Sequence, residues 1–106
     1  MKITFMGAGS TIFVRRVIGD CMSSPIFQNV EFCLYDIDPV RLEESRVILE
    51  AIRAFSNFPC TLRLYCGVEN RKEALRGASF VINAIQVGLY DPCTITDFEV
   101  PKKYGL

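Results

Sequence analysis

The first fourteen residues contain the feature that most constrains the fold, an apolar strand that runs through a glycine turn into a helix. The strand-like run ends at Met6, glycines follow at positions 7 and 9, and apolar residues at helical spacing begin near Thr11. Gly7 allows a sharp turn, and Gly9 leaves no side chain between the backbone and a bound phosphate. The free N–H groups of the next helix attract negative charge. This segment predicts a dinucleotide-binding turn, with an ordinary tight turn as the alternative.

One position departs from the G-x-G-x-x-G fingerprint of dinucleotide-binding proteins. Ile12 stands where a third glycine normally allows the helix to pack closely on the strand. A G-x-G pair alone is weak evidence, so the interpretation needs support from the rest of the chain.

Strands and helices are expected to alternate after the turn. Apolar runs predict strands at 30–35, 60–66 and 79–85, and amphipathic spacing predicts helices at about 11–22 and 39–55. Capping-box spacing at Asn70 with Glu73, and at Thr96 with Glu99, predicts two further short helices. The strict alternation in 60–66 is typical of an edge strand. The sequence therefore predicts an α/β fold, a Rossmann-like doubly wound parallel sheet of about four strands in the order 3-2-1-4.

Two aspartates follow the second predicted strand and have different expected roles. Asp36 ends that strand 27 residues after Gly9 (36 − 9), near the spacing at which an acidic side chain binds the ribose of a dinucleotide. A carboxylate there favours NAD over its 2′-phosphorylated form, because two negative charges would otherwise meet. Asp38 directly precedes Pro39, a pairing typical of a helix N-terminus, so we expect Asp38 to cap the helix.

Two amides near the end of the fourth predicted strand are further candidates for cofactor binding. The first and fourth strands flank the switch point of a doubly wound sheet, so Asn83 and Gln86 should lie beside the glycine turn, near the nicotinamide half of the cofactor. The alternative is that both amides only satisfy loop backbone groups.

Composition excludes several classes of function. Twelve basic and twelve acidic residues give zero formal charge, which argues against a nucleic-acid partner. The five cysteines form no C-x-x-C pair and the chain has no histidine, so neither a zinc site nor a disulfide framework is expected. The opening apolar run is too short for a membrane span and lacks the features of a secretory signal, which favours a cytoplasmic protein.

Six stretches of the chain form a recognisable pattern: Gly7–Val14, Gly19–Asp20, Asp36–Pro39, Arg41–Ser45, Cys93–Val100 and Lys103–Leu106. Together they resemble the amino-terminal part of glycoside hydrolase family 4, and within it the α-galactosidases, or melibiases. The resemblance includes the non-glycine residue at Ile12, which the family pattern shares.

The resemblance implies a glycosidase that depends on NAD and manganese, an exception to the two-carboxylate scheme. It acts by oxidation at sugar C3, elimination of the aglycone and addition of water, and the metal stabilises negative charge. It also implies a sugar substrate and a homo-oligomeric parent protein. The implied cofactor contacts are the pyrophosphate at Gly7, Gly9, Ser10, Thr11 and Ile12, the adenosine ribose at Asp36, and the inner pocket at Asn83 and Gln86.

The family's metal-binding cysteine and histidine and its tyrosine base belong to segments beyond the matched region. We therefore expect residues 1–106 to be an incomplete NAD-binding domain that lacks the catalytic and metal domain and is inactive alone. Leu89 stands where melibiases commonly have a glycine, so the resemblance does not specify which sugar is the substrate. The competing hypotheses are an NAD-dependent dehydrogenase of the malate or lactate type and a non-catalytic remnant.

Overall fold

In the computed structural model, which describes residues 1–106, four parallel strands form one sheet in the order β3-β2-β1-β4. The central strand β1 pairs with β2 on one side and with β4 on the other. This arrangement confirms the predicted α/β fold and its strand order. The strands are β1 (Lys2–Met6), β2 (Glu31–Asp36), β3 (Thr61–Cys66) and β4 (Phe80–Asn83).

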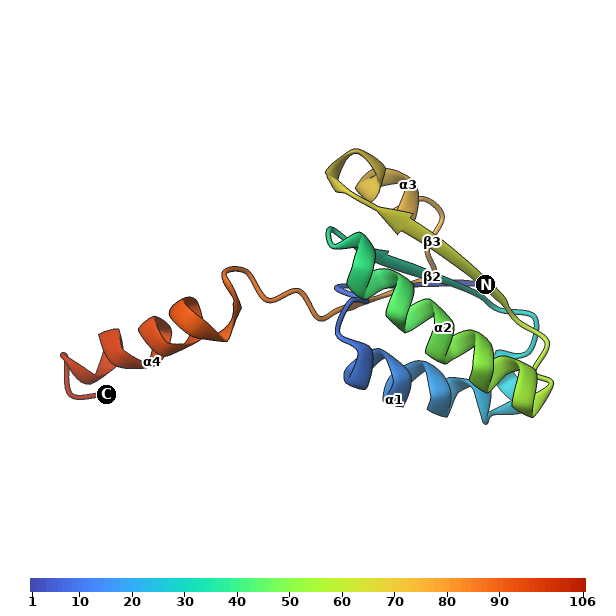
Figure 1. Cartoon of the computed structure of the whole chain (residues 1–106), viewed down its shortest axis with the longest axis horizontal. Helices are drawn as coiled ribbons and strands as arrows, with labels where there is room; N and C mark the ends of the chain where they lie inside the picture. The colour runs from blue at the N-terminus through green and yellow to red at the C-terminus, as the bar shows by residue number, and fades with distance from the viewer.

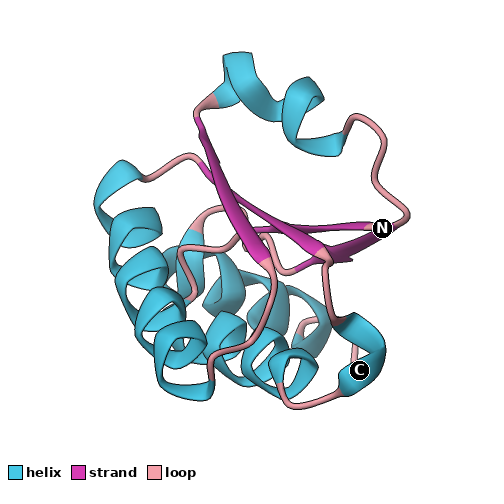
Figure 2. Ribbon diagram, turned by 90° about the vertical axis from the view of Figure 1, so that its right-hand side faces the viewer, coloured by secondary structure: helices cyan, strands magenta, loops and turns pink.

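Helices cover both faces of the sheet. Helices α1 and α2 lie side by side against one face, and α3 lies on the opposite face (Figures 1 and 2). The helices are α1 (Thr11–Met22), α2 (Pro39–Ser56), α3 (Arg71–Leu75) and α4 (Ile95–Lys102). Three shorter helical turns are η1 (Pro25–Phe27), η2 (Val68–Asn70) and η3 (Leu89–Thr94).

The core is divided between the two faces because successive side chains of a strand point in opposite directions. On the α1 and α2 side, the largest fully buried side chains are Phe5, Phe32, Leu34, Val14, Ile18 and Leu49. On the α3 side, a smaller cluster contains Met6, Cys33, Tyr35 and Ala74. The larger cluster packs α1 and α2 against the central strands.

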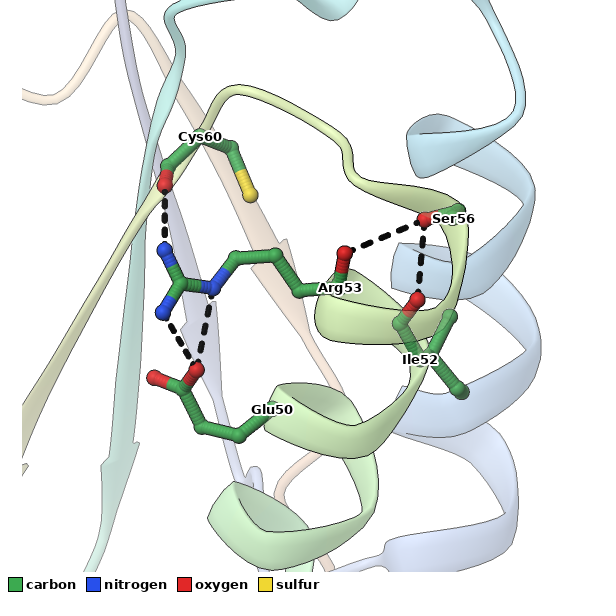
Figure 3. A network of polar contacts seen from close by, with 5 residues as sticks. All are labelled: Glu50, Ile52, Arg53, Ser56 and Cys60. Atoms are coloured by element: carbon green, nitrogen blue, oxygen red, sulfur yellow. Dashed lines mark hydrogen bonds and ion pairs between the residues drawn. The ribbon is translucent and has the colours of Figure 1, made fainter.

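A polar network joins the end of α2 to the start of β3 (Figure 3). The Arg53 guanidinium donates from Nε to Glu50 Oε2 at 2.9 Å and from Nη1 to the Cys60 carbonyl at 3.1 Å. The Ser56 hydroxyl donates instead to the Ile52 carbonyl of its own helix, at 2.8 Å. Arg53 therefore holds the loop after α2 against the helix, in addition to its half-buried pairing with Glu50.

Both predicted short helices are present, as α3 and α4, but neither predicted capping box forms. The Asn70 side chain caps no helix and donates to the Cys66 carbonyl at 2.8 Å. Thr96 lies inside α4, where its hydroxyl donates to the Pro92 carbonyl at 2.9 Å. In each case a carbonyl four residues earlier in the chain offers an acceptor, and the side chain binds there instead of to the helix N–H groups.

Three apolar side chains are more exposed than their sequence pattern indicates. Phe80 and Val81 of β4 are 62% and 50% exposed, because β4 is an edge strand and no helix packs closely on either of its faces. Phe55, an apolar residue in the last turn of α2, is 96% exposed. The segment after β4 carries α4 away from the sheet (Figure 1). No helix combines the length and the apolarity needed to cross a membrane.

We expect Leu49→Ala to lower the free energy of unfolding by about 2 to 5 kcal/mol, because the substitution leaves a cavity between α2 and the sheet. The matched control is Phe55→Ala in the same helix, where an exposed side chain is removed and a change within about 0.5 kcal/mol is expected. Chemical denaturation followed by circular dichroism measures both values. Equal losses would contradict the described core.

Candidate functional site

The glycine turn connects β1 to α1 at the carboxyl end of the sheet, and both of its glycines are required by close neighbours. Gly7 has a φ of +89°, and a Cβ atom there would lie 2.6 Å from the Ala84 carbonyl oxygen. A Cβ atom on Gly9 would lie 2.7 Å from Oδ2 of Asp36 and 2.9 Å from Cβ of Arg41. A side chain at Gly9 would therefore displace the carboxylate expected to bind ribose.

Hydrogen bonds from neighbouring elements hold the turn in place. The N–H groups of Gly7 and Ala8 both donate to the Tyr35 carbonyl, at 2.9 and 2.8 Å. The Gly9 N–H donates to Asp36 Oδ2 at 2.7 Å. On the other side, the buried Ser45 hydroxyl of α2 donates to the Ala8 carbonyl at 2.5 Å. The chain itself therefore uses all three N–H groups from Gly7 to Gly9.

The first N–H groups of α1 remain available to a ligand. Within the chain, the N–H groups of Thr11, Ile12 and Phe13 form no backbone hydrogen bond, and Ser10 supplies no side-chain cap. Ser10 and Ile12 are exposed. Unpaired N–H groups at a helix N-terminus, with the positive end of the helix dipole, suit an anion.

Asp36 lies beside this helix end, where the sequence places it. Its Oδ2 accepts from Gly9, and its Oδ1 accepts from the Asp38 N–H at 2.9 Å. Since a carboxylate offers about four acceptor positions, two remain for the hydroxyl groups of a ligand. Asp38 caps α2 as expected, with its Oδ1 accepting from the Val40 and Arg41 N–H groups at 3.0 and 3.2 Å.

The two candidate amides differ in position. Asn83 is in register with Met6, the last residue of β1, and lies at the same sheet edge as the turn. Its Oδ1 accepts from the Ile85 N–H at 3.2 Å, so one end of this amide satisfies the loop backbone. Gln86 lies on the exposed segment after β4 and donates to the Thr94 hydroxyl. Asn83 therefore lies at the end of the sheet where the turn begins, whereas the Gln86 side chain contacts Thr94 in the segment after β4.

Ser45 is a member of this site that the sequence interpretation missed. It is fully buried on α2 between Leu42 and Leu49, at the spacing of the apolar face. A lone serine among apolar positions of an amphipathic helix is the signal that could have identified it, because a buried hydroxyl needs a partner. The Tyr35 contact is made by a backbone carbonyl and leaves no sequence signal.

Three of the five cysteines have thiols that burial makes less reactive. Burial raises the pKa of the Cys33, Cys60 and Cys21 thiols, which favours the neutral form at pH 7. The Cys33 thiol donates to the Ala74 carbonyl at 3.5 Å. No group of three or more histidine, cysteine, aspartate or glutamate side chains in the chain is arranged to hold a metal ion.

Comparison with known proteins identifies relatives along the whole chain. Residues 2–106 match the sequence model of a protein family, family 4 glycosyl hydrolase. An α-galactosidase of Bacillus subtilis (strain 168) is 53% identical over 99% of this chain and 24% of its own length. An α-glucosidase of Erwinia rhapontici is 33% identical over 99% of this chain and 22% of its own length. An α-galactosidase of Rhizobium meliloti (strain 1021) is 31% identical over 99% of this chain and 21% of its own length. The chain therefore spans less than a quarter of these curated relatives.

We expect Gly7→Ala to cost about 2 to 5 kcal/mol of stability, because the new methyl group meets a backbone carbonyl and the left-handed φ strains any L-residue. Gly77→Ala is the control, since Gly77 has a φ of +70° and no atom within 4 Å of the added Cβ. It should cost about 1 to 2 kcal/mol from the backbone strain alone. Thermal or chemical unfolding measures the difference, and equal costs would contradict the close approach of the Ala84 carbonyl to the turn.

Proposed function

The chain belongs to family 4 of the glycosyl hydrolases, and on that premise we propose that it is the NAD-binding portion of an α-glycosidase, with an α-galactoside as substrate. The observation that carries the cofactor assignment is the juxtaposition of unpaired N–H groups at the start of α1 with the Asp36 carboxylate. Family membership argues against the alternative of a malate-type or lactate-type dehydrogenase. The names of the relatives support a glycosidase, and two of the three are α-galactosidases.

The residues of the site fit a dinucleotide. The N–H groups at the start of α1 suit the negatively charged pyrophosphate, and Gly7 and Gly9 allow the close turn that brings this helix end beside Asp36. The remaining acceptor positions of Asp36 suit the adenosine ribose hydroxyl groups. Asn83 and Gln86 are the candidates for the inner part of the cofactor pocket. In the proposed assignment the pyrophosphate lies against Gly7, Gly9, Ser10, Thr11 and Ile12.

Bound NAD would supply a reversible hydride acceptor for oxidation and later reduction of the sugar at C3. The role of this chain is to bind and orient that cofactor, since none of its residues is assigned to acid–base chemistry. The proposal places the manganese site and the catalytic base in other segments of a longer protein. Residues 1–106 then form an incomplete NAD-binding domain, and a cytoplasmic, homo-oligomeric parent protein is part of the same proposal.

NAD⁺ binding tests the cofactor assignment. We expect isothermal titration to detect binding, and we expect Asp36→Asn to weaken it about tenfold, because bonds to a charged acceptor are replaced by weaker neutral ones. The variant should also discriminate less against NADP⁺, whose extra phosphate no longer faces a carboxylate. Asp38→Asn is the control, since asparagine is also a good N-cap and position 38 is assigned no ligand. Absence of heat and of a thermal shift at millimolar NAD⁺ would favour the non-catalytic remnant.

The 106-residue chain alone should not hydrolyse glycosides. We expect no release of nitrophenol from p-nitrophenyl α-galactoside when the purified chain is supplied with NAD⁺, Mn²⁺ and a thiol reductant, because the proposed base and metal site lie elsewhere. The B. subtilis α-galactosidase, assayed in parallel, shows whether the assay conditions support turnover by a relative. Turnover by the short chain above the enzyme-free rate would refute this part of the proposal.

A further inference from the structure

The peptide group between Ala8 and Gly9 is held at both of its ends. Its carbonyl oxygen accepts from the Ser45 hydroxyl at 2.5 Å, and its N–H donates to Asp36 Oδ2 at 2.7 Å. Because a peptide group is planar, the direction of the carbonyl oxygen sets the direction of the N–H. The contact with Ser45 on α2 thereby fixes the donor that reaches Asp36 at the end of β2.

We propose that Ser45 is a positioning residue for NAD binding, acting through the Ala8–Gly9 peptide on the Asp36 carboxylate. This inference rests on the proposed function. With the Gly9 N–H on Oδ2 and the Asp38 N–H on Oδ1, the carboxylate has one orientation, in which its remaining acceptor positions are presented to the ribose hydroxyl groups. Loss of the Ser45 hydroxyl leaves the buried Ala8 carbonyl without its partner and removes the restraint on the peptide plane.

A second buried hydroxyl provides a matched comparison. Thr4 of β1 is also fully buried and donates to a backbone carbonyl, that of Ala74 in α3, at 2.7 Å. Ala74 packs on the opposite face of the sheet from α2. Thr4→Val and Ser45→Ala therefore each remove one buried hydroxyl hydrogen bond to a backbone carbonyl, although the Ala74 carbonyl keeps the Cys33 thiol as a donor, and only Ser45→Ala touches the turn. A purely structural role for Ser45 predicts that the two variants behave alike toward NAD⁺.

The experiment measures NAD⁺ dissociation constants by isothermal titration, at a temperature where circular dichroism shows each variant to be folded. We expect Ser45→Ala to bind NAD⁺ at least tenfold more weakly than the unmodified chain, and Thr4→Val to bind within twofold. In an Asp36→Asn background, Ser45→Ala should weaken binding by no more than a further threefold, because its effect passes through Asp36. Ser45→Cys is slightly larger and has a weaker donor, should give an intermediate constant, and replaces Ser45→Ala if that variant does not fold.

Several outcomes would overturn the proposal. The role of Ser45 is refuted if Ser45→Ala, or Ser45→Cys in its place, has an NAD⁺ dissociation constant within twofold of the unmodified chain while Asp36→Asn binds more weakly. The proposed function would then still stand. If Thr4→Val and the Ser45 variant weaken NAD⁺ binding equally, the effect of Ser45 comes from a general loss of stability and not from positioning Asp36. A full additional loss in the Asp36→Asn background contradicts transmission through Asp36. Absence of NAD⁺ binding by the unmodified chain refutes the proposed function together with this inference.

Discussion

The structure of the candidate site depends on the close approach of the glycine turn to the end of β2. Three consecutive N–H groups of the turn donate to Tyr35 and Asp36, and this contact requires a glycine next to the carboxylate. The same contact leaves the N–H groups at the start of α1 as the available donors. The turn therefore links the paired strands β1 and β2, the start of α1 and the Asp36 carboxylate of the proposed cofactor pocket.

Much of this arrangement could be predicted from the sequence because it follows from local patterns. The apolar runs gave the four strands, the glycine spacing gave the turn, and Asp38 before Pro39 gave the helix cap. The strand order followed from the rule for doubly wound sheets. Asp36 could be placed beside the turn because the carboxyl ends of parallel strands share one edge.

Some features could not be predicted because the hydrogen-bond partner is distant in sequence. Others were predicted wrongly because a nearby backbone carbonyl competes for the same side chain. Ser45 is separated from Ala8 by 37 residues, and only the packing of α2 on the sheet brings them together. Asn70 and Thr96 have the spacing of caps, but nearby carbonyls compete for the same side chains. Gly9 was expected to leave space for a bound phosphate, whereas in the structure its missing side chain leaves space for the Asp36 carboxylate.

The anchors of the turn also affect when it can form during folding. Gly9 and Asp36 are 27 residues apart, so the turn cannot acquire its final geometry until β2 has paired with β1 and α2 has docked. Contacts of such sequence separation carry a loop-closure cost before they contribute stability. A nascent chain that has exposed only β1 and α1 therefore contains the glycine sequence without its native conformation. Cofactor binding would then report on completed folding of the α1 and α2 layer.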